Sequence, residues 1–297
     1  MDHRKSTFWQ APWDTIQGMG EHSVVVWFTV ALFMAGLVCE IILVSSLFRS
    51  GASSVSSRFS HVVTKPWGLG EAGLIAGTLF ALLLIGSLVL SGIEHYGHLE
   101  GDDFKRAQML ASILVIDGLG LFAILLLLRV ERIGLGEAFG MRARTFLGAI
   151  GRGVFCLLAV IPPVWVLAGM SQQLCEWFHI SNEPQEMAQL FLDCDSIGFR
   201  AAIALLAVVA APLFEEMFFR GLAYPALKQK IGQWPALVVT SLVFAAIHIH
   251  APSFLPLCAL AVGLTLAYEA TGTLTVPIVM HCLFNLMSIL VMAMVPS

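Results

Sequence analysis

Long apolar segments recur along the chain and are separated by shorter polar ones. A helix of about 20 apolar residues crosses the hydrocarbon core of a bilayer. Eight such segments are predicted here: Val24–Leu47, Ala72–Ile93, Met109–Leu128, Gly153–Met170, Ala201–Tyr224, Trp234–Ile249, Phe254–Ala270 and Thr275–Met294. The first four are the clearest, and the last four are shorter or more polar. The pattern predicts an all-α polytopic membrane protein with about eight transmembrane helices.

Composition supports a lipid environment. Charged residues make up 12% of the 297 residues, against about 25% in an ordinary soluble domain. Hydrophobic residues make up 58%, and the mean hydropathy is +0.85. These values exclude a disordered chain, a nucleic-acid-binding protein with a basic face, and a soluble enzyme. Membrane lipids are therefore the expected surroundings, and no nucleic-acid partner is expected.

We expect three regions along the chain. Residues 1–23 form an N-terminal segment, residues 24–200 hold four transmembrane helices with their loops, and residues 201–297 form a C-terminal region with the last four spans. The first apolar run is too long for the apolar part of a signal peptide, and no small-residue cleavage site follows it. It is therefore expected to be retained.

Lys and Arg residues predict the orientation. They are concentrated in the loops after the first, third and fifth spans, whereas the loops after the second and fourth are mostly acidic. The positive-inside rule then places the basic loops in the cytoplasm and both termini outside, although Arg4 and Lys5 count against this.

Cys175 and Cys194 share the acidic loop after the fourth span. An outer location permits a disulfide between them, and the sequence leaves their state open.

Ionisable residues at membrane depth need a structural or functional explanation, because placing a charged side chain near the bilayer centre costs about 3 kcal/mol or more of free energy. Glu40 and Asp117 stand alone in the first and third spans, where a hydrogen bond between helices is the simplest explanation. Glu269 lies near a span end and is expected to reach interfacial water.

The C-terminal spans contain a larger polar set: Glu215, Glu216, Arg220, His248, His281 and Asn285. At 1.5 Å per helical residue, Glu215 and His248 lie about 20 Å from the cytoplasmic connection between their spans. His281 and Asn285 lie about 12 and 18 Å from that side. Polar side chains from three spans are therefore expected at a similar depth in the membrane. A buried polar network that only joins the helices is the alternative explanation.

Spacing along the helices suggests separate roles. Glu216 and Arg220 are four residues apart, so they share a helix face and can pair. Glu215 is turned about 100° from that pair and is the better catalytic base. His281 and Asn285 also share a face. Pro212 lacks a backbone N–H and should loosen the helix beside Glu215.

Three short patterns resemble a known family. They are Glu215-Glu216-Met-Phe-Phe-Arg220, Phe244-Ala-Ala-Ile-His248 and His281-Cys-Leu-Phe-Asn285. Together they are similar to the motifs of the CPBP intramembrane proteases, also called Abi, which include the Ras-converting type of CAAX prenyl protease. The resemblance covers about residues 200–295 and implies that residues 201–297 are a catalytic core like that of this family. The first four spans carry no recognised motif.

The resemblance implies hydrolysis of a peptide bond in the membrane. It suggests that Glu215 and His248 activate water, that His281 and Asn285 stabilise the oxyanion, and that Glu216 and Arg220 support the base. No cofactor is favoured, but zinc stays open, because Glu215, His248 and His281 are also the residue types of a catalytic zinc site. Asn285 is a poor zinc ligand and a natural oxyanion donor.

The expected function is an integral membrane endopeptidase with its active site nearer the cytoplasmic side. Its substrate would be a membrane-embedded or lipid-anchored peptide or protein, and the sequence does not say whether that substrate is prenylated. The alternative is a transporter, or an immunity protein for a peptide toxin, that uses the same polar cluster for binding only.

Overall fold

The computed structural model describes residues 23–50, 61–62, 65–97, 102–181, 185–194 and 196–294. The expected N-terminal segment lies almost wholly outside the described residues. Within the described part every regular element is a helix. Seven of the described helical segments are long and apolar enough to cross a membrane. The chain is therefore an all-α, multi-pass membrane protein, as predicted.

The first half supplies four long helices. They are α2 (Ser23–Ser50), α4 (Leu69–Gly97), α5 (Asp102–Val130) and α7 (Phe146–Trp177). Each is longer than the span predicted for it, because polar turns at the ends continue the helix beyond the apolar run. Two short elements, α6 (Leu135–Phe139) and η1 (Ala143–Thr145), connect α5 to α7.

The second half begins with α8 (Glu186–Asp193) and continues into one long helical run, Ile197–Ile231. This run comprises α9 (Ile197–Leu205), η2 (Leu206–Ala210), α10 (Ala211–Glu216), η3 (Met217–Ala223) and α11 (Tyr224–Ile231). The last elements are α12 (Gln233–Ala246), α13 (Ala251–Thr271) and α14 (Thr275–Met294). Both η2 and η3 are π-helical, a conformation found often at functional sites.

One predicted span differs from the structure. The segment Trp234–Ile249 was expected to cross the membrane, but α12 has 14 residues, which corresponds to about 21 Å. The helix ends at Ala246, and Ile249 has a positive φ of 46°. Apolar residues continue past the helix end, so hydropathy alone overestimates its length. The polar site residue His248 consequently lies in the turn between α12 and α13.

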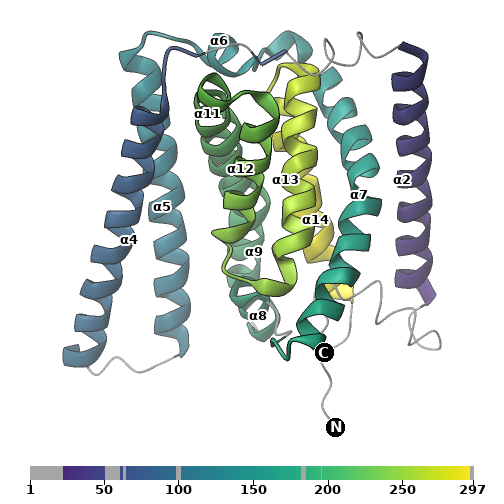
Figure 1. Ribbon diagram of the computed structural model, residues 1–297. Helices are drawn as coiled ribbons and strands as arrows, with labels where there is room; N and C mark the ends of the chain where they lie inside the picture. The colour runs from purple at the N-terminus through teal and green to yellow at the C-terminus, as the bar shows by residue number, and fades with distance from the viewer. Residues whose placement is uncertain are drawn as a thin grey trace.

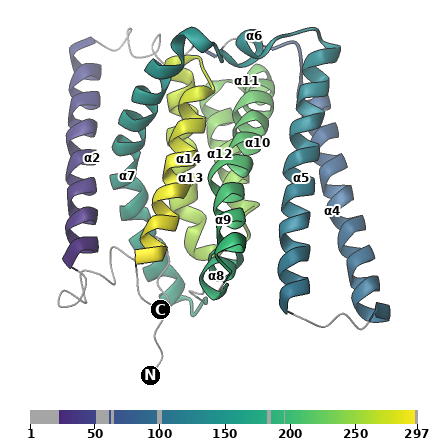
Figure 2. The ribbon, with the colours of Figure 1, turned by 180° about the vertical axis from the view of Figure 1, so that it is seen from behind.

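The helices form a bundle with two distinct ends (Figures 1 and 2). The α6 end holds α6, the end of α11 and the turn from α13 to α14. The α8 end holds α8, the end of α7 and the C-terminal end of α14. Helices α7, α12, α13 and α14 pack together, α2 lies against α7, and the α4–α5 pair lies against α10 on the other side.

Glycine permits close contacts in this bundle. A Cβ at Gly263 of α13 would lie 2.4 Å from Val160 of α7, and one at Gly120 of α5 would lie 2.2 Å from the Phe214 ring. Small residues at such crossings allow helices to approach closely in a membrane. The second of these contacts positions α5 directly beside the helix that carries Glu215.

Candidate active site

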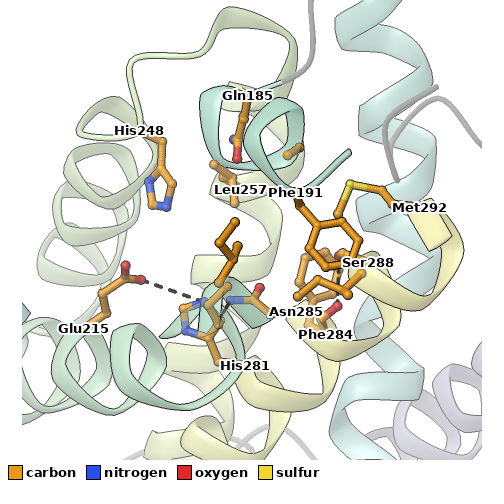
Figure 3. Close-up of a pocket in the computed structure, with 14 residues that line it drawn as sticks. Gln185, Phe191, Glu215, His248, Leu257, His281, Phe284, Asn285, Ser288 and Met292 are labelled. Carbon is orange, nitrogen blue, oxygen red and sulfur yellow. Dashed lines mark hydrogen bonds and ion pairs between the residues drawn. The ribbon is translucent and has the colours of Figure 1, made fainter. Parts of the chain in front are cut away.

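A cavity of about 160 Å³ lies among the C-terminal helices. Glu215, His248, His281 and Asn285 all line it, and their side chains face a common space (Figure 3). They come from α10, the turn after α12, and α14. The structure therefore brings together the four residues expected to act in catalysis. Their individual roles remain proposals.

Glu215 is the exposed member of the carboxylate pair. Its side chain is 20% exposed, and its Oε2 lies 3.8 Å from Nε2 of His281, beyond hydrogen-bond distance. The carboxylate therefore has room to bind water in the cavity.

Glu216 has the opposite surroundings. It is fully buried, and its Oε1 accepts hydrogen bonds from Arg220 Nη1 at 2.8 Å and His281 Nδ1 at 2.9 Å. The pairing of Glu216 with Arg220 agrees with the four-residue spacing. The bond to His281 was not predicted, because single-sequence spacing gives no information on contacts between helices. Glu216 thus orients a residue of the cavity wall, as carboxylates often orient histidines in active sites.

Arg220 is held on three sides. Besides Glu216, it donates to the carbonyl oxygen of Ala261 at 3.1 Å, and its guanidinium lies 4.6 Å from the centre of the Phe244 ring. The same ring contacts the imidazoles of His248 and His281 at centroid distances of 5.0 and 5.8 Å. Phe244, the first residue of the second motif, therefore packs beneath the site and fixes three of its polar side chains.

His248 has one defined tautomer in this geometry. Its Nδ1 lies 2.7 Å from the carbonyl oxygen of Phe244. A carbonyl can only accept, so Nδ1 carries the hydrogen. Nε2 is then the nitrogen with a free lone pair, which is the form that can accept a proton.

Asn285 is fixed by a feature of the π-helix. The amide of Ala211 bonds to the carbonyl of Leu206, five residues back. The next carbonyl in this register, Ala207, would receive the N–H of residue 212, but Pro212 has none. Nδ2 of Asn285 donates to Ala207 instead, at 2.7 Å. Pro212 thus creates an acceptor for Asn285, and the second hydrogen of its amide remains available.

The remaining cavity wall comes from residues that carried no sequence signal. Gln185, Ala188 and Phe191 approach from α8 and the residue before it, and Ser288 and Met292 from the end of α14. Their residue types are common in membrane helices, so no pattern distinguishes them. They place this part of the cavity toward the α8 end (Figures 1 and 3). The expectation that the site lies nearer the cytoplasmic side stays a prediction, since it rests on the basic residues of the loops.

The donor groups are not arranged as a metal site. Among the described residues, no three His, Cys, Asp or Glu side chains lie close enough to share a metal ion. The set considered for zinc, Glu215, His248 and His281, therefore does not fit a shared metal ion as the side chains stand, and we derive no step through a metal.

Two other expectations can be compared with the structure. Cys175 and Cys194 are buried free cysteines. Glu269 does not reach water, since it is fully buried and accepts hydrogen bonds from Tyr224, Lys228 and the backbone of Val62. The prediction of solvent contact for Glu269 was wrong because these partners come from segments distant in the sequence.

Asp117 has a buried oxygen with no partner among the described residues.

Comparison with known proteins gives one match. Residues 197–287 match the family model Rce1-like, described as type II CAAX prenyl endopeptidase Rce1-like. No curated protein and no solved structure matches the chain. The matched segment contains all three motifs, so the resemblance seen in the sequence is confirmed for this region.

Proposed function

We propose that this chain, whose residues 197–287 match the family model of the Rce1-like type II CAAX prenyl endopeptidases, hydrolyses a peptide bond within the membrane. The observation that carries the proposal is the convergence of Glu215, His248, His281 and Asn285 on one cavity in a lipid-embedded bundle. The substrate would be a membrane-embedded or lipid-anchored peptide or protein.

The first step is activation of water. A water molecule between Glu215 and Nε2 of His248 would donate one hydrogen bond to each. As its oxygen attacks the carbonyl carbon of the substrate, Glu215 takes the proton. General-base catalysis of this kind contributes about 10²- to 10⁴-fold to the rate.

The oxyanion that forms needs hydrogen-bond donors. Asn285 offers the second hydrogen of Nδ2, and His281 offers Nε2, which faces the cavity because Nδ1 is bound to Glu216. A donor at Nε2 requires protons on both ring nitrogens, and the carboxylate of Glu216 together with the oxyanion itself supplies the countercharge. One such donor lowers the barrier by about 3–4 kcal/mol. Glu215 then passes its proton to the leaving amine, which completes hydrolysis.

Comparative analysis of membrane peptides tests this function. Cells expressing the wild-type chain are compared with cells expressing Glu215→Gln at equal abundance. We expect peptides with new termini in the wild type that are absent in the variant. A phenotype that survives Glu215→Gln, with no peptide cleaved by the wild type, would support the alternative, in which the cluster only binds a transported solute or a peptide toxin.

Metal dependence has its own test. Purified active protein is expected to retain cleavage after treatment with a chelator. Stoichiometric zinc in the purified protein, with activity lost on removal and restored on addition, would overturn water activation by Glu215 and His248 alone.

A further inference from the structure

Gln185 is a polar residue of the cavity wall that the proposed mechanism does not use. It lies directly before α8 and precedes the segment 197–287 that matches the family model. Besides the four residues proposed for the chemistry, Gln185 and Ser288 are the residues with polar side chains in this wall. The hydroxyl of Ser288 donates to the carbonyl oxygen of Phe284 in its own helix, at 2.9 Å. The amide of Gln185 is therefore the polar group of the wall that needs an explanation.

The nitrogen end of the Gln185 amide is held by a buried residue. Its Nε2 donates to the hydroxyl oxygen of Ser253 at 3.1 Å, and this oxygen lies 2.7 Å from Nδ1 of His250. Ser253 is fully buried in the first turn of α13. That turn is joined to α7 by a hydrogen bond from Ser171 to the carbonyl oxygen of Ala251, at 3.3 Å. The position of Nε2 is thus set by the packed helices.

The oxygen end of the same amide faces the cavity. No described residue donates a hydrogen bond to Oε1 of Gln185. Figure 3 shows the amide pointing into the cavity toward Leu257, at a place separate from His281 and Glu215. Because Ser253 binds Nε2, the amide is not free to turn its nitrogen inward. The wall therefore presents a fixed acceptor that lies apart from the groups proposed to act on the cleaved bond.

A peptide that enters this cavity loses the water bound to its backbone, and each of its N–H groups then needs an acceptor. The proposed oxyanion donors bind the carbonyl oxygen of the cleaved bond, and Glu215 binds the attacking water, so neither serves these N–H groups. Resting on the proposed function, we propose that Gln185 is a substrate-binding residue whose Oε1 accepts a hydrogen bond from a backbone N–H of the peptide. Ser253 is a positioning residue that holds the amide of Gln185 in this orientation.

Gln185→Leu tests the binding role, because it removes the acceptor and keeps a side chain of similar size. The probe is a peptide found to be cleaved in cells with the wild type and not in cells with Glu215→Gln. We expect KM to rise by about 3- to 10-fold, the effect of one lost hydrogen bond, with kcat near the wild type. Gln189→Leu is the control, since Gln189 lies one turn later and does not line the cavity. An unchanged KM for Gln185→Leu would overturn the proposal.

The peptide offers a second test that compares each protein with itself. Single backbone N–H groups are replaced by an ester oxygen, one position at a time and never at the cleaved bond. In the wild type, one such replacement should raise KM by about the factor seen for Gln185→Leu. The same replacement should have no further effect in Gln185→Leu. Equal losses in both proteins at every position would show that Gln185 does not bind the backbone.

Ser253→Ala tests the positioning role. It should raise KM in the wild type but cause no further rise when combined with Gln185→Leu, because the two residues act through one hydrogen bond to the peptide. A rise that persists in the double variant would contradict this role. A wild type that cleaves no peptide would refute the proposed function, whereas cleavage with a KM insensitive to Gln185 would refute only the present inference.

Discussion

Glu215 and Glu216 are adjacent in the sequence but have different surroundings. Glu215 is 20% exposed to the cavity, whereas Glu216 is fully buried between Arg220 and His281. The difference follows from helix geometry, because neighbouring residues point about 100° apart. One position can therefore perform chemistry while the next holds the structure together.

Replacing the buried carboxylate should mainly affect stability. Glu216→Gln leaves Arg220 buried without a countercharge, and loss of one partner of a buried ion pair costs about 3–5 kcal/mol. We expect a clear fall in melting temperature in detergent or nanodiscs, together with lost cleavage. Glu215→Gln is the matched control and should melt close to the wild type. Equal melting temperatures for wild type and Glu216→Gln would show that the pair does not stabilise the bundle.

At the scale of single elements, the long helical run Ile197–Ile231 contains two π-helical stretches, each followed by a proline. Each π-helical stretch is followed within two residues by a proline, Pro212 or Pro225, whose missing N–H leaves a carbonyl without its helical donor. At Pro212 that carbonyl belongs to Ala207 and accepts from Asn285. The π-helix thereby links backbone geometry to the position of Asn285, the proposed oxyanion donor.

Pro212→Ala tests this link. The new N–H would compete with Asn285 for the Ala207 carbonyl, so the amide would lose its fixed position. We expect kcat to fall by about 10- to 100-fold, because small displacements of positioned groups have effects of this size. KM should change little. Pro225→Ala is the control, since its π-helical stretch does not line the cavity, and its kcat should stay near the wild type. A similar loss in both variants would indicate a general disturbance of the helix.

Contact between α5 and α10 offers a second test at this scale. Gly120→Ala would place a Cβ against the Phe214 ring, and overpacking of this kind costs about 1–3 kcal/mol. Gly118→Ala is the control, because nothing lies within 4 Å of its Cβ position and alanine favours the helix. We expect a lower melting temperature for Gly120→Ala alone. No difference between the two variants would mean that α5 does not pack closely on α10.

Sequence patterns predicted the elements better than their contacts. Hydropathy located all eight apolar segments, and helical spacing paired Glu216 with Arg220, since both signals depend on neighbours along the chain. The bond from His281 to Glu216 and the cavity residues of α8 join segments far apart in sequence, and no local pattern reports them. The length of α12 was overestimated because the apolar residues Ile247 and Ile249 continue beyond its last turn.

On the scale of the whole molecule, one buried carboxylate joins distant segments at the α6 end. Glu269 of α13 accepts from Lys228 and Tyr224 of α11 and from the backbone of Val62, which lies before α4. Lys228 also donates to the carbonyl of Val62, at 3.0 Å. This network lies away from the cavity and connects the two halves of the chain.

Lys228→Met should therefore destabilise the fold without changing the chemistry. It removes the cation beside a fully buried Glu269, with an expected cost of about 3–5 kcal/mol. We expect a lower melting temperature, and near-normal kcat at temperatures where the variant is folded. Lys230→Met, at an exposed position two residues away, should behave as the wild type. A stable Lys228→Met protein would show that Tyr224 and the Val62 amide suffice for Glu269.

The central claim is that Glu215 activates water for peptide hydrolysis. The most direct measurement is the rate of cleavage of an identified substrate peptide by purified wild type and Glu215→Gln in nanodiscs, with thermal melting of both samples. We predict a fall in kcat of about 10²-fold or more with an unchanged melting temperature, because the carboxylate acts on the proton and does not hold the bundle together. A folded Glu215→Gln variant that cleaves at the wild-type rate would contradict the mechanism.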